Sequence, residues 1–209
     1  SELDLAGSLD QPLLSGQVDI SNVRVKGKQA PVDIDDADIT LTLSGQQASL
    51  QGLVTTTRGE IKLSGDASWQ QLSDWQAQVN ITGDELRLQV PQASLQIAPD
   101  LMLTANSQRT RISGSVNIPI ANINVDNLPA SAVELSDDVV LLDTQLQPIE
   151  AEQKQAFALE TDINVVLGNR VRLSAFGLKT RLAGNLRVRQ LAEQPLRVNG
   201  DVSLIDGTF

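Results

Sequence analysis

The sequence contains no cysteine, no histidine and no tyrosine, and its 209 residues include only three Phe and two Trp. It therefore lacks the commonest general base, the thiolate nucleophile and the best zinc ligands of proteins. The motifs of nucleophile elbows, phosphate-binding loops and dinucleotide folds are missing too. We expect no enzymatic activity, no bound metal and no cofactor.

Long hydrophobic runs are also missing. No segment approaches the roughly 20 apolar residues of a membrane-spanning helix, and no secretory signal opens the chain. The first residue is Ser1 rather than Met, and Phe209 follows directly on a strand-like pattern. We expect a piece of a longer protein, whose targeting information lies outside these residues.

The net charge of −10 argues against a nucleic-acid partner. The charge is unevenly distributed along the chain. Residues 1–160 contain 9 Lys and Arg against 22 Asp and Glu, a balance of −13. Residues 161–209 contain 7 against 4, a balance of +3. The last quarter of the chain is therefore electrostatically distinct from the rest.

The hydrophobic residues, which make up 41% of the chain, exclude a disordered protein. They are unusual in kind, because Leu, Ile, Val and Ala supply nearly all of the apolar surface. Aromatic side chains usually contribute much of the buried area of a globular core. A purely aliphatic surface is smooth, and it suits flexible alkyl chains as well as a packed core.

Apolar and polar residues alternate with the period of a β-strand, and no segment before residue 126 has a convincing helical period. Turn signals separate the runs: Ser73-Asp74, Gly83-Asp84, Pro91-Gln92, Pro99-Asp100 and Asn106-Ser107. Such short connections favour antiparallel neighbours. The sequence predicts an all-β protein of roughly 15 strands, and open sheets of that size usually curl or split.

A glycine recurs between two aliphatic or alanine residues at seven places in the chain. The seven glycines are Gly7, Gly16, Gly52, Gly65, Gly114, Gly184 and Gly200. Residues two apart in a strand share a face, so each glycine lies on the apolar face and lets the strand bend or bulge there. We expect six of them, Gly16 onward, to curve the sheet. Their irregular spacing argues against a solenoid with a fixed short repeat.

Two interpretations of the apolar face remain open. It forms either the closed core of a sandwich or barrel, or the concave lining of an open groove. The scarcity of aromatics and the glycines in line with the aliphatic residues favour the groove. The residues predicted to line it are Leu14, Val18, Ile20, Ile39, Leu41, Leu43, Leu63, Val79, Ile81, Leu86, Leu88, Leu101, Leu103, Ile112, Val116, Ile118, Leu182, Leu186, Val188, Val198, Val202 and Leu204.

Residues 126–155 interrupt the alternation, with Pro129 and Pro148 at either side of an acidic stretch. We interpret this segment as an irregular connection within one continuous β unit that covers residues 1–209. Strand patterns resume after it and continue to the end of the chain.

Three groups of side chains stand out from the pattern. Asp33, Asp35, Asp36 and Asp38 form an acidic cluster, which lacks the glycine and closing glutamate of a calcium loop and is better explained as a solvated edge. Trp69 and Trp75 flank a tight connection and are predicted to pair across two strands. Six arginines alternate with aliphatic residues: Arg170, Arg172, Arg181, Arg187, Arg189 and Arg197. They form either a docking stripe for an acidic partner or anionic headgroups, or an ordinary solvent-facing surface.

The last fifty residues resemble a known family. The segments Leu167-Gly-Asn-Arg-Val-Arg-Leu173, Arg181-Leu-Ala-Gly-Asn-Leu186 and Pro195-Leu-Arg-Val-Asn-Gly-Asp-Val202, with Ile205-Asp-Gly-Thr-Phe209, are similar to the conserved C-terminal region of the TamB family. This family provides the inner-membrane subunit of the bacterial translocation and assembly module, and belongs with AsmA-like and bridge-like lipid-transfer proteins. The first 160 residues share its loose β pattern without a sharp motif.

The resemblance implies an elongated, curved and mostly antiparallel sheet with an aliphatic concave face, called a β-taco. It further implies a periplasmic location, anchorage of the whole protein in the inner membrane, and the outer-membrane protein TamA as a partner. The expected function is a segment of a conduit that moves phospholipids between the two membranes, with their acyl chains in the groove. The alternative is a chaperone-like groove that holds strands of outer-membrane proteins or autotransporters.

Overall fold

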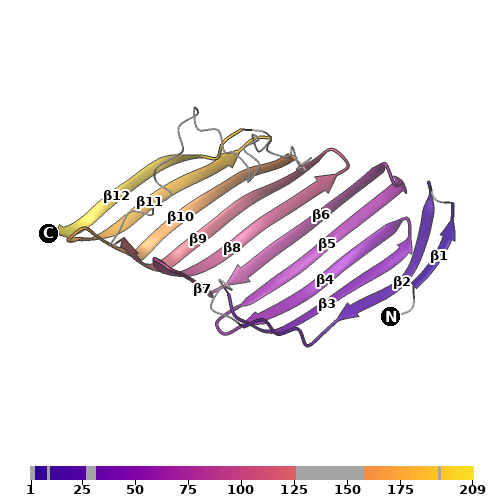
Figure 1. The fold of residues 1–209 in the computed structure, drawn as a ribbon, viewed down its shortest axis with the longest axis horizontal. Coiled ribbons are helices and arrows are strands. Elements are labelled where there is room, and N and C mark those ends of the chain that lie inside the picture. The colour runs from indigo at the N-terminus through magenta and orange to yellow at the C-terminus, as the bar shows by residue number, and fades with distance from the viewer. Residues whose placement is uncertain (1–2, 9, 27–31, 126–157, 193) are drawn as a thin grey trace, which may run out of the picture.

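The computed structural model of the chain describes residues 3–8, 10–26, 32–125, 158–192 and 194–209. Within these residues the chain forms strands and turns and no helix. The strands are β1 Leu3–Gly7, β2 Pro12–Ile20, β3 Ile34–Gly45, β4 Gln47–Thr56, β5 Glu60–Gln71, β6 Asp74–Asp84, β7 Leu86–Val90, β8 Ala93–Asn106, β9 Arg109–Val125, β10 Ala158–Ala175, β11 Leu178–Gln190 and β12 Arg197–Thr208. All twelve belong to one sheet (Figure 1).

The sheet follows the order of the chain. Strands β1 to β6 and β8 to β12 lie side by side in sequence order, and β7 pairs with β8 beyond the end of β6. Every pairing is antiparallel except that of β9 with β10, which is parallel. A parallel pair needs a connection of a dozen or more residues, and 32 residues separate these two strands in the sequence. The irregular connection predicted at residues 126–155 lies outside the described residues.

The described strands are fewer and longer than the sequence predicts. The predicted turn at Pro99-Asp100 is wrong, because β8 runs through it from Ala93 to Asn106. Proline is tolerated there since Pro99 lies opposite the gap between β6, whose pairing ends at Asp100, and β7, whose pairing begins at Ile97.

The signal at Gly83-Asp84 marks an interruption and not a reversal. Glu85, with a positive φ of 51°, separates β6 from β7, and both strands pair with the same edge of β8. The other three signals lie at hairpin turns, as predicted.

Irregularities of register occur in several strands of the C-terminal half of the sheet. They lie between Gln96 and Ala98 in β8, between Leu167 and Val171 in β10, and between Lys179 and Arg181 in β11. Bulges bend a strand and increase its twist. Those in β8 and β10 both lie opposite residues 117–120 of β9, so these strands bend at the same level, whereas the one in β11 lies closer to the start of its strand.

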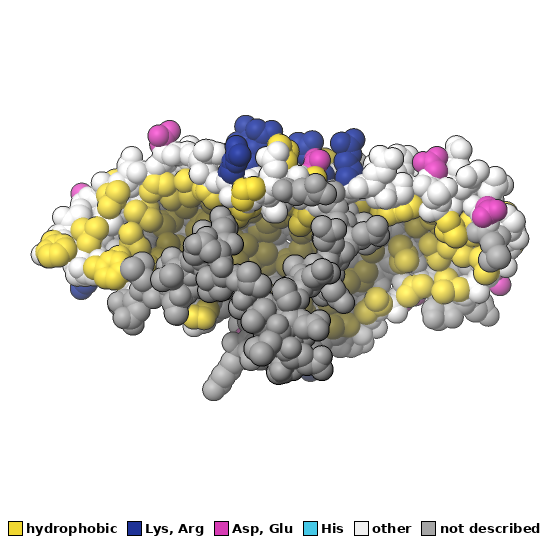
Figure 2. Space-filling model, turned by 45° about the horizontal axis from the view of Figure 1, so that its top comes forward, with side chains coloured by type: hydrophobic (Ala, Val, Ile, Leu, Met, Phe, Trp, Pro, Cys, Tyr) yellow, Lys and Arg dark blue, Asp and Glu magenta, His cyan; other side chains and the backbone are white. Residues whose placement is uncertain are grey.

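The sheet is open and has a single layer. Among the described residues only five hydrophobic side chains are buried, those of Ala37, Val54, Leu86, Ala121 and Val171. A closed sandwich or barrel of this size would bury many more. The closed-core interpretation is therefore wrong, and the open sheet predicted as the alternative is confirmed. Figure 2 shows hydrophobic side chains gathered along the hollowed face from one end of the sheet to the other.

Two long rims border this face. We call upper rim the one that carries the turns before β2, β4, β6 and β9, and lower rim the one that carries the turns before β5, β8 and β11, as oriented in Figure 1. Along the upper rim the first hairpins are drawn together. The Trp69 Nε1–H donates to the Pro12 carbonyl at 2.9 Å, and the Leu72 amide donates to the Asp10 carbonyl at 3.2 Å. Trp69 also lies directly opposite Trp75, so their predicted cross-strand pairing is confirmed.

Candidate functional site

The hollowed face carries an unbroken row of apolar residues from β2 to β12. Each member of the row lies directly opposite the next on the neighbouring strand, so all point to the same side of the sheet. The row consists of Ile20, Ile39, Gly52, Leu63, Ile81, Leu101, Gly114, Ile163, Val188 and Val198. It crosses the parallel junction between β9 and β10 without a polar interruption. We call this side the apolar face.

The register places all 22 predicted lining residues on the apolar face. Leu86 is buried, and most of the others are half-buried. Near the two ends of the sheet they are exposed: Ile20 on β2 is 47% accessible, and Leu204 on the edge strand β12 is 61% accessible. No second layer covers this face among the described residues, and it meets the solvent directly at both ends.

Sequence reasoning omitted the contribution of β10 from the predicted lining. Ile163, Val165 and Leu167 lie between β9 and β11 on the apolar face, opposite Val188, Leu186 and Gly184. Their alternation is visible in the sequence, but the parallel partner that brings β10 into the centre of the sheet is not. Leu50 and Leu95 belong to the same face and were also omitted.

The signature glycines hold two neighbouring backbones close together. Gly184 on β11 and Gly200 on β12 both have a φ of +147°, a region open to glycine and closed to other residues. A Cβ on Gly184 would lie 2.0 Å from the Asp201 carbonyl oxygen, and one on Gly200 would lie 2.1 Å from that of Asn185. These glycines therefore serve backbone geometry first, and a gap in the side-chain layer is the by-product.

The remaining predicted glycines fall into two classes. Gly16 and Gly114 share the positive φ, at 133° and 132°. Gly52 lacks it, and a Cβ there would meet the side chains of Ile39 and Leu63 at 3.3 to 3.4 Å. At Gly65 a Cβ would lie 2.5 Å from the Gln78 carbonyl oxygen. Side chains from adjacent strands therefore reach over Gly52, whereas close backbone approach constrains Gly65 and Gly114.

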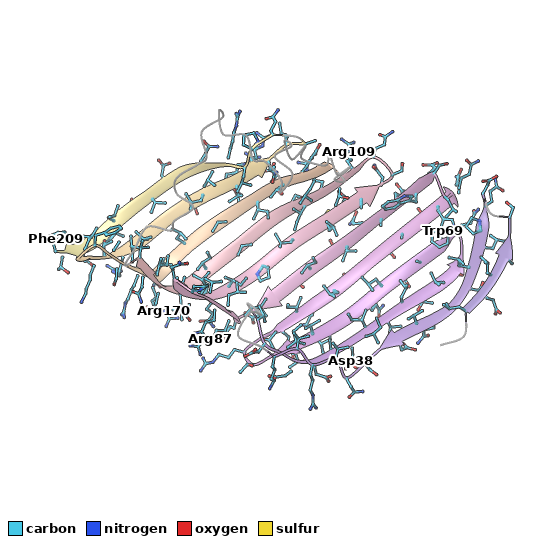
Figure 3. All side chains as sticks on the ribbon, in the orientation of Figure 1. Asp38, Trp69, Arg87, Arg109, Arg170 and Phe209 are labelled. Atoms are coloured by element: carbon cyan, nitrogen blue, oxygen red, sulfur yellow. The ribbon has the colours of Figure 1, made fainter. Side chains whose placement is uncertain are left out.

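The six predicted arginines project from the opposite, polar side of the sheet, and they form two groups rather than one stripe. Arg187, Arg189 and Arg197 lie near the upper rim, at the end of β11 and the start of β12. Arg170, Arg172 and Arg181 lie near the lower rim, close to the register shifts of β10 and β11. Figure 3 shows Arg170 and Arg87 along the lower rim and Arg109 at the upper rim.

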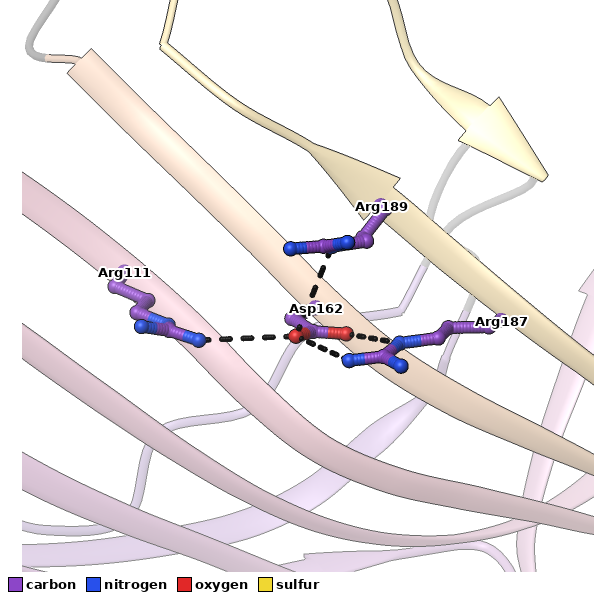
Figure 4. A network of polar contacts seen from close by, with 4 residues as sticks. All are labelled: Arg111, Asp162, Arg187 and Arg189. Atoms are coloured by element: carbon purple, nitrogen blue, oxygen red, sulfur yellow. Dashed lines mark hydrogen bonds and ion pairs between the residues drawn. The ribbon is translucent and has the colours of Figure 1, made fainter. Parts of the chain in front are cut away.

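Arg187 and Arg189 of the upper group, together with Arg111 on β9, surround Asp162 on β10 (Figure 4). The Arg187 guanidinium donates two hydrogen bonds to its carboxylate, at 2.8 and 2.9 Å. Arg111 on β9 and Arg189 lie farther away, at 3.7 and 3.9 Å. The hydrogen bonds from Arg187, together with the charges of all three arginines, lower the pKa of Asp162 below its usual range. The same pairing raises the pKa of Arg187.

The acidic cluster lies at the lower-rim end of β3, where the strand pairs with β4 and extends beyond the end of β2. On the other side only the isolated bridge between Val25 and Ile34 is present, which is consistent with the predicted solvated edge. Asp35 forms an ion pair with Lys26 at 2.9 Å, which lowers the pKa of Asp35. Within the described residues no three acidic, histidine or cysteine side chains gather as metal ligands do. The described ranges also contain no helix with the length and hydropathy to cross a bilayer.

Comparison with known proteins identifies the family. Residues 46–209 match the family model described as the TamB C-terminal domain. The whole chain aligns with the translocation and assembly module subunit TamB of Haemophilus influenzae at 34% identity over 218 residues. The chain spans 17% of the length of that relative. No solved structure matches the chain. The match over most of the chain, on an open sheet of the kind the resemblance implied, shows that the chain belongs to the TamB family.

Proposed function

We propose that this part of the protein is a segment of a hydrophobic conduit for phospholipids. The observation that carries the proposal is the apolar row that runs from Ile20 to Val198 across the sheet without a polar break and without a covering layer among the described residues. Acyl chains lie along this face, while headgroups stay in water beyond the rims. The transfer is passive, and no chemical step is assigned to the chain.

The energy of acyl chains in water explains why a continuous groove is useful. Burial of one CH₂ group contributes about 0.8 kcal/mol, so a lipid with about 30 such groups meets a penalty near 25 kcal/mol in bare water. An aliphatic face offsets much of this penalty at every position. Because it offers few directional contacts, it does not trap the lipid at any of them. The row from Ile20 to Val198 contains no aromatic or polar side chain, which is consistent with movement along it.

The wider setting forms part of the proposal. The name of the Haemophilus influenzae relative assigns that protein to a translocation and assembly module. We place this chain in the periplasm, as part of a protein anchored in the bacterial inner membrane. TamA is the partner in the outer membrane, and the lipids serve outer-membrane assembly.

Trp69 and Trp75 provide a direct test, because they are the only two tryptophans and both lie on the apolar face. Phosphatidylcholine with brominated acyl chains quenches indole fluorescence only on close contact. We expect titration with this lipid to quench the fluorescence of both tryptophans in the folded protein. The same lipid, at the same concentration and below its solubility limit, should not quench them in the denatured protein. Unchanged fluorescence of the folded chain at saturating lipid would contradict the proposal.

The alternative function is a chaperone-like groove for strands of outer-membrane proteins or autotransporters. It is favoured by the two edge strands, whose apolar residues are widely exposed: Leu5 on β1 is 72% accessible and Leu204 on β12 is 61% accessible. An incoming strand would pair with such an edge through its backbone. Photo-crosslinkers at Val202 and Asp201, neighbours on β12 that face opposite sides, separate the two functions. Added strands react at both positions, whereas lipids react at Val202 alone.

A further inference from the structure

The charge of the described residues changes sign along the sheet. Residues 3–106 carry 5 Lys and Arg against 13 Asp and Glu among the described positions. The described residues from 109 to 209 carry 9 against 4. The groove therefore has acidic surroundings over its first strands and basic surroundings from β9 to β12, where Figure 2 shows Lys and Arg side chains gathered at the upper rim.

The most concentrated positive charge belongs to the upper rim cluster, defined as Arg109, Arg111, Arg187, Arg189 and Arg197. Two acidic residues, Asp162 and Glu160, lie on the strand between them. The Asp162 carboxylate is 19% exposed and is held by Arg187, whereas the side chains of Arg111, Arg187 and Arg189 are each more than half exposed. The half-buried acid therefore holds the arginines at the sheet surface and leaves most of their donors turned to solvent.

The arrangement carries a cost that packing does not explain. Arg189 on β11 lies directly opposite Arg197 on β12, and like charges in directly opposed positions destabilise a sheet. Asp162 and Glu160, which lies directly opposite Arg111, would neutralise only two of the five arginines. Surplus arginines held in repulsive positions at a groove rim are typical of a site that awaits an anion.

A recess lies beside the cluster, at the hairpin between β8 and β9. It has a volume of about 230 Å³ and is lined by Thr104, Ala105, Asn106, Arg109 and Arg111. Asn106 Oδ1 accepts the amides of Gln108 and Arg109, both at 3.0 Å, and so fixes the turn that carries Arg109. Two guanidinium groups and a hydroxyl around a small rim recess match the donors that a phosphate group requires.

We propose that the upper rim cluster binds the phosphate of anionic lipid headgroups, with Arg109 and Arg111 as its principal ligands. The cluster projects from the polar side of the sheet next to the upper rim. The proposal therefore rests on the conduit function: the acyl chains lie on the apolar face, and the headgroup reaches over the rim to the arginines. It adds a substrate class, since lipids with a net negative charge are favoured from β9 to β12 and disfavoured along the acidic first strands. Zwitterionic lipids occupy the groove without this preference.

The test uses the 209-residue chain and three variants. The first is the double variant R109Q/R111Q. The second, R24Q/K62Q, removes the same amount of charge from the acidic half, where Arg24 and Lys62 are both exposed. The third, Asp162→Asn, removes the acid that supports the cluster. Strand content by circular dichroism identifies any variant that fails to fold.

Binding is measured by co-sedimentation with vesicles of phosphatidylcholine alone or with one quarter phosphatidylglycerol. An arginine near an anionic surface contributes about fivefold to binding, so R109Q/R111Q should weaken phosphatidylglycerol binding about 25-fold. R24Q/K62Q should change it by less than about twofold. Equal losses in both double variants would show diffuse attraction and overturn the proposal, as would an unchanged R109Q/R111Q.

Two further arms separate the possible failures. Quenching of Trp69 and Trp75 by brominated phosphatidylcholine should be the same in R109Q/R111Q and the unchanged chain, so the conduit is tested independently of the headgroup site. Absence of quenching in both the variant and the unchanged chain would contradict the conduit, and the vesicle-binding measurement could still be interpreted. Inorganic phosphate, titrated calorimetrically, should bind only weakly. Saturable micromolar binding of phosphate, without preference for phosphatidylglycerol, would assign the cluster to a free anion and overturn the lipid assignment.

Discussion

Gly184 and Gly200 show how single residues set the shape of this sheet. They lie on adjacent strands, and each faces the backbone of the other strand where a Cβ would collide with a carbonyl oxygen. The two strands can approach only because both positions lack a side chain. The missing side chains also leave a gap in the side-chain layer of the apolar face. One requirement of the backbone therefore also shapes the surface available to a ligand.

We expect Gly184→Ala to destabilise the protein by about 1–3 kcal/mol, since alanine must adopt a conformation reserved for glycine and avoid Asp201. Gly207→Ala on β12 is the matched control. A Cβ there would meet nothing closer than Leu178 Cδ1 at 3.7 Å. Urea unfolding followed by circular dichroism measures both, and equal losses in the two variants would contradict the backbone role of Gly184.

Asp162 predicts a dependence on pH. The hydrogen bonds from Arg187 and the nearby arginine charges lower its pKa in the folded protein below the ordinary value of 3.8. A carboxyl with a lowered pKa stabilises the fold above its unfolded pKa, and this contribution disappears as the pH falls through the folded pKa. We expect the difference in unfolding free energy between the unchanged chain and Asp162→Asn to be full at pH 7 and to shrink below about pH 4.

The control for this measurement is Asp201→Asn, which removes an exposed carboxyl from β12 and leaves the contacts of Arg187 in place. It should retain the acid-dependent loss of stability seen in the unchanged chain. An Asp162→Asn variant with the same loss below pH 4 as the unchanged chain would show that Asp162 is not its source.

The hairpin of β1 and β2 depends on contacts at its turn. It pairs with the sheet only through Leu14 to Ile20, and the Trp69 indole adds a hydrogen bond to Pro12 from three strands away. We expect Trp69→Phe to weaken the attachment of this hairpin by about 1 kcal/mol, the usual contribution of one hydrogen bond. Amides of residues 3–20 should then exchange with deuterium about fivefold faster, while those of β10 do not change.

Trp75→Phe is the matched variant, because Trp75 lies opposite Trp69 on the same face and the bond to Pro12 belongs to Trp69. It should leave the exchange of residues 3–20 unchanged. The same acceleration in both variants would indicate that general loss of aromatic packing, and not the indole hydrogen bond, holds the hairpin.

Individual strands were largely predictable from the sequence, and their partners were not. Alternation locates each apolar face, and short turn signals pair consecutive strands, as at Pro91-Gln92 and Asn106-Ser107. The pairing of β9 with β10 is parallel and spans 32 residues, so no local signal specifies it. The strand through Pro99 was missed for a similar reason, since only the placement of its neighbours reveals the gap between β6 and β7 opposite the proline.

The openness of the whole sheet is the feature that sequence periodicity leaves undecided. A strand in a closed sandwich and a strand beside an open groove alternate in the same way. The scarcity of aromatics favoured the groove, but the decisive observation is the continuity of the apolar row over the parallel junction together with the small number of buried side chains. Sequence periodicity also could not show that the six predicted arginines form two groups. Their positions along the strands become distances in space only once the strands are placed side by side.

Val165 and Val166, adjacent on β10, test this openness in one experiment. Val165 lies on the apolar face between Val116 and Leu186, whereas Val166 points to the polar side between Asn117 and Asn185. Each is changed to aspartate, so the loss of β-propensity is the same for both. In a closed core, Val165→Asp would bury an unpaired charge and cost several kcal/mol more than Val166→Asp.

On an open face the two variants should unfold within about 1 kcal/mol of each other, because water reaches both carboxylates. Their effects on lipid should differ sharply. Val165→Asp places a charge in the proposed path of the acyl chains and should abolish most of the quenching of Trp69 and Trp75 by brominated phosphatidylcholine, whereas Val166→Asp should preserve it. A large loss of stability confined to Val165→Asp would mean that the face is covered in solution, and the groove would then be a core.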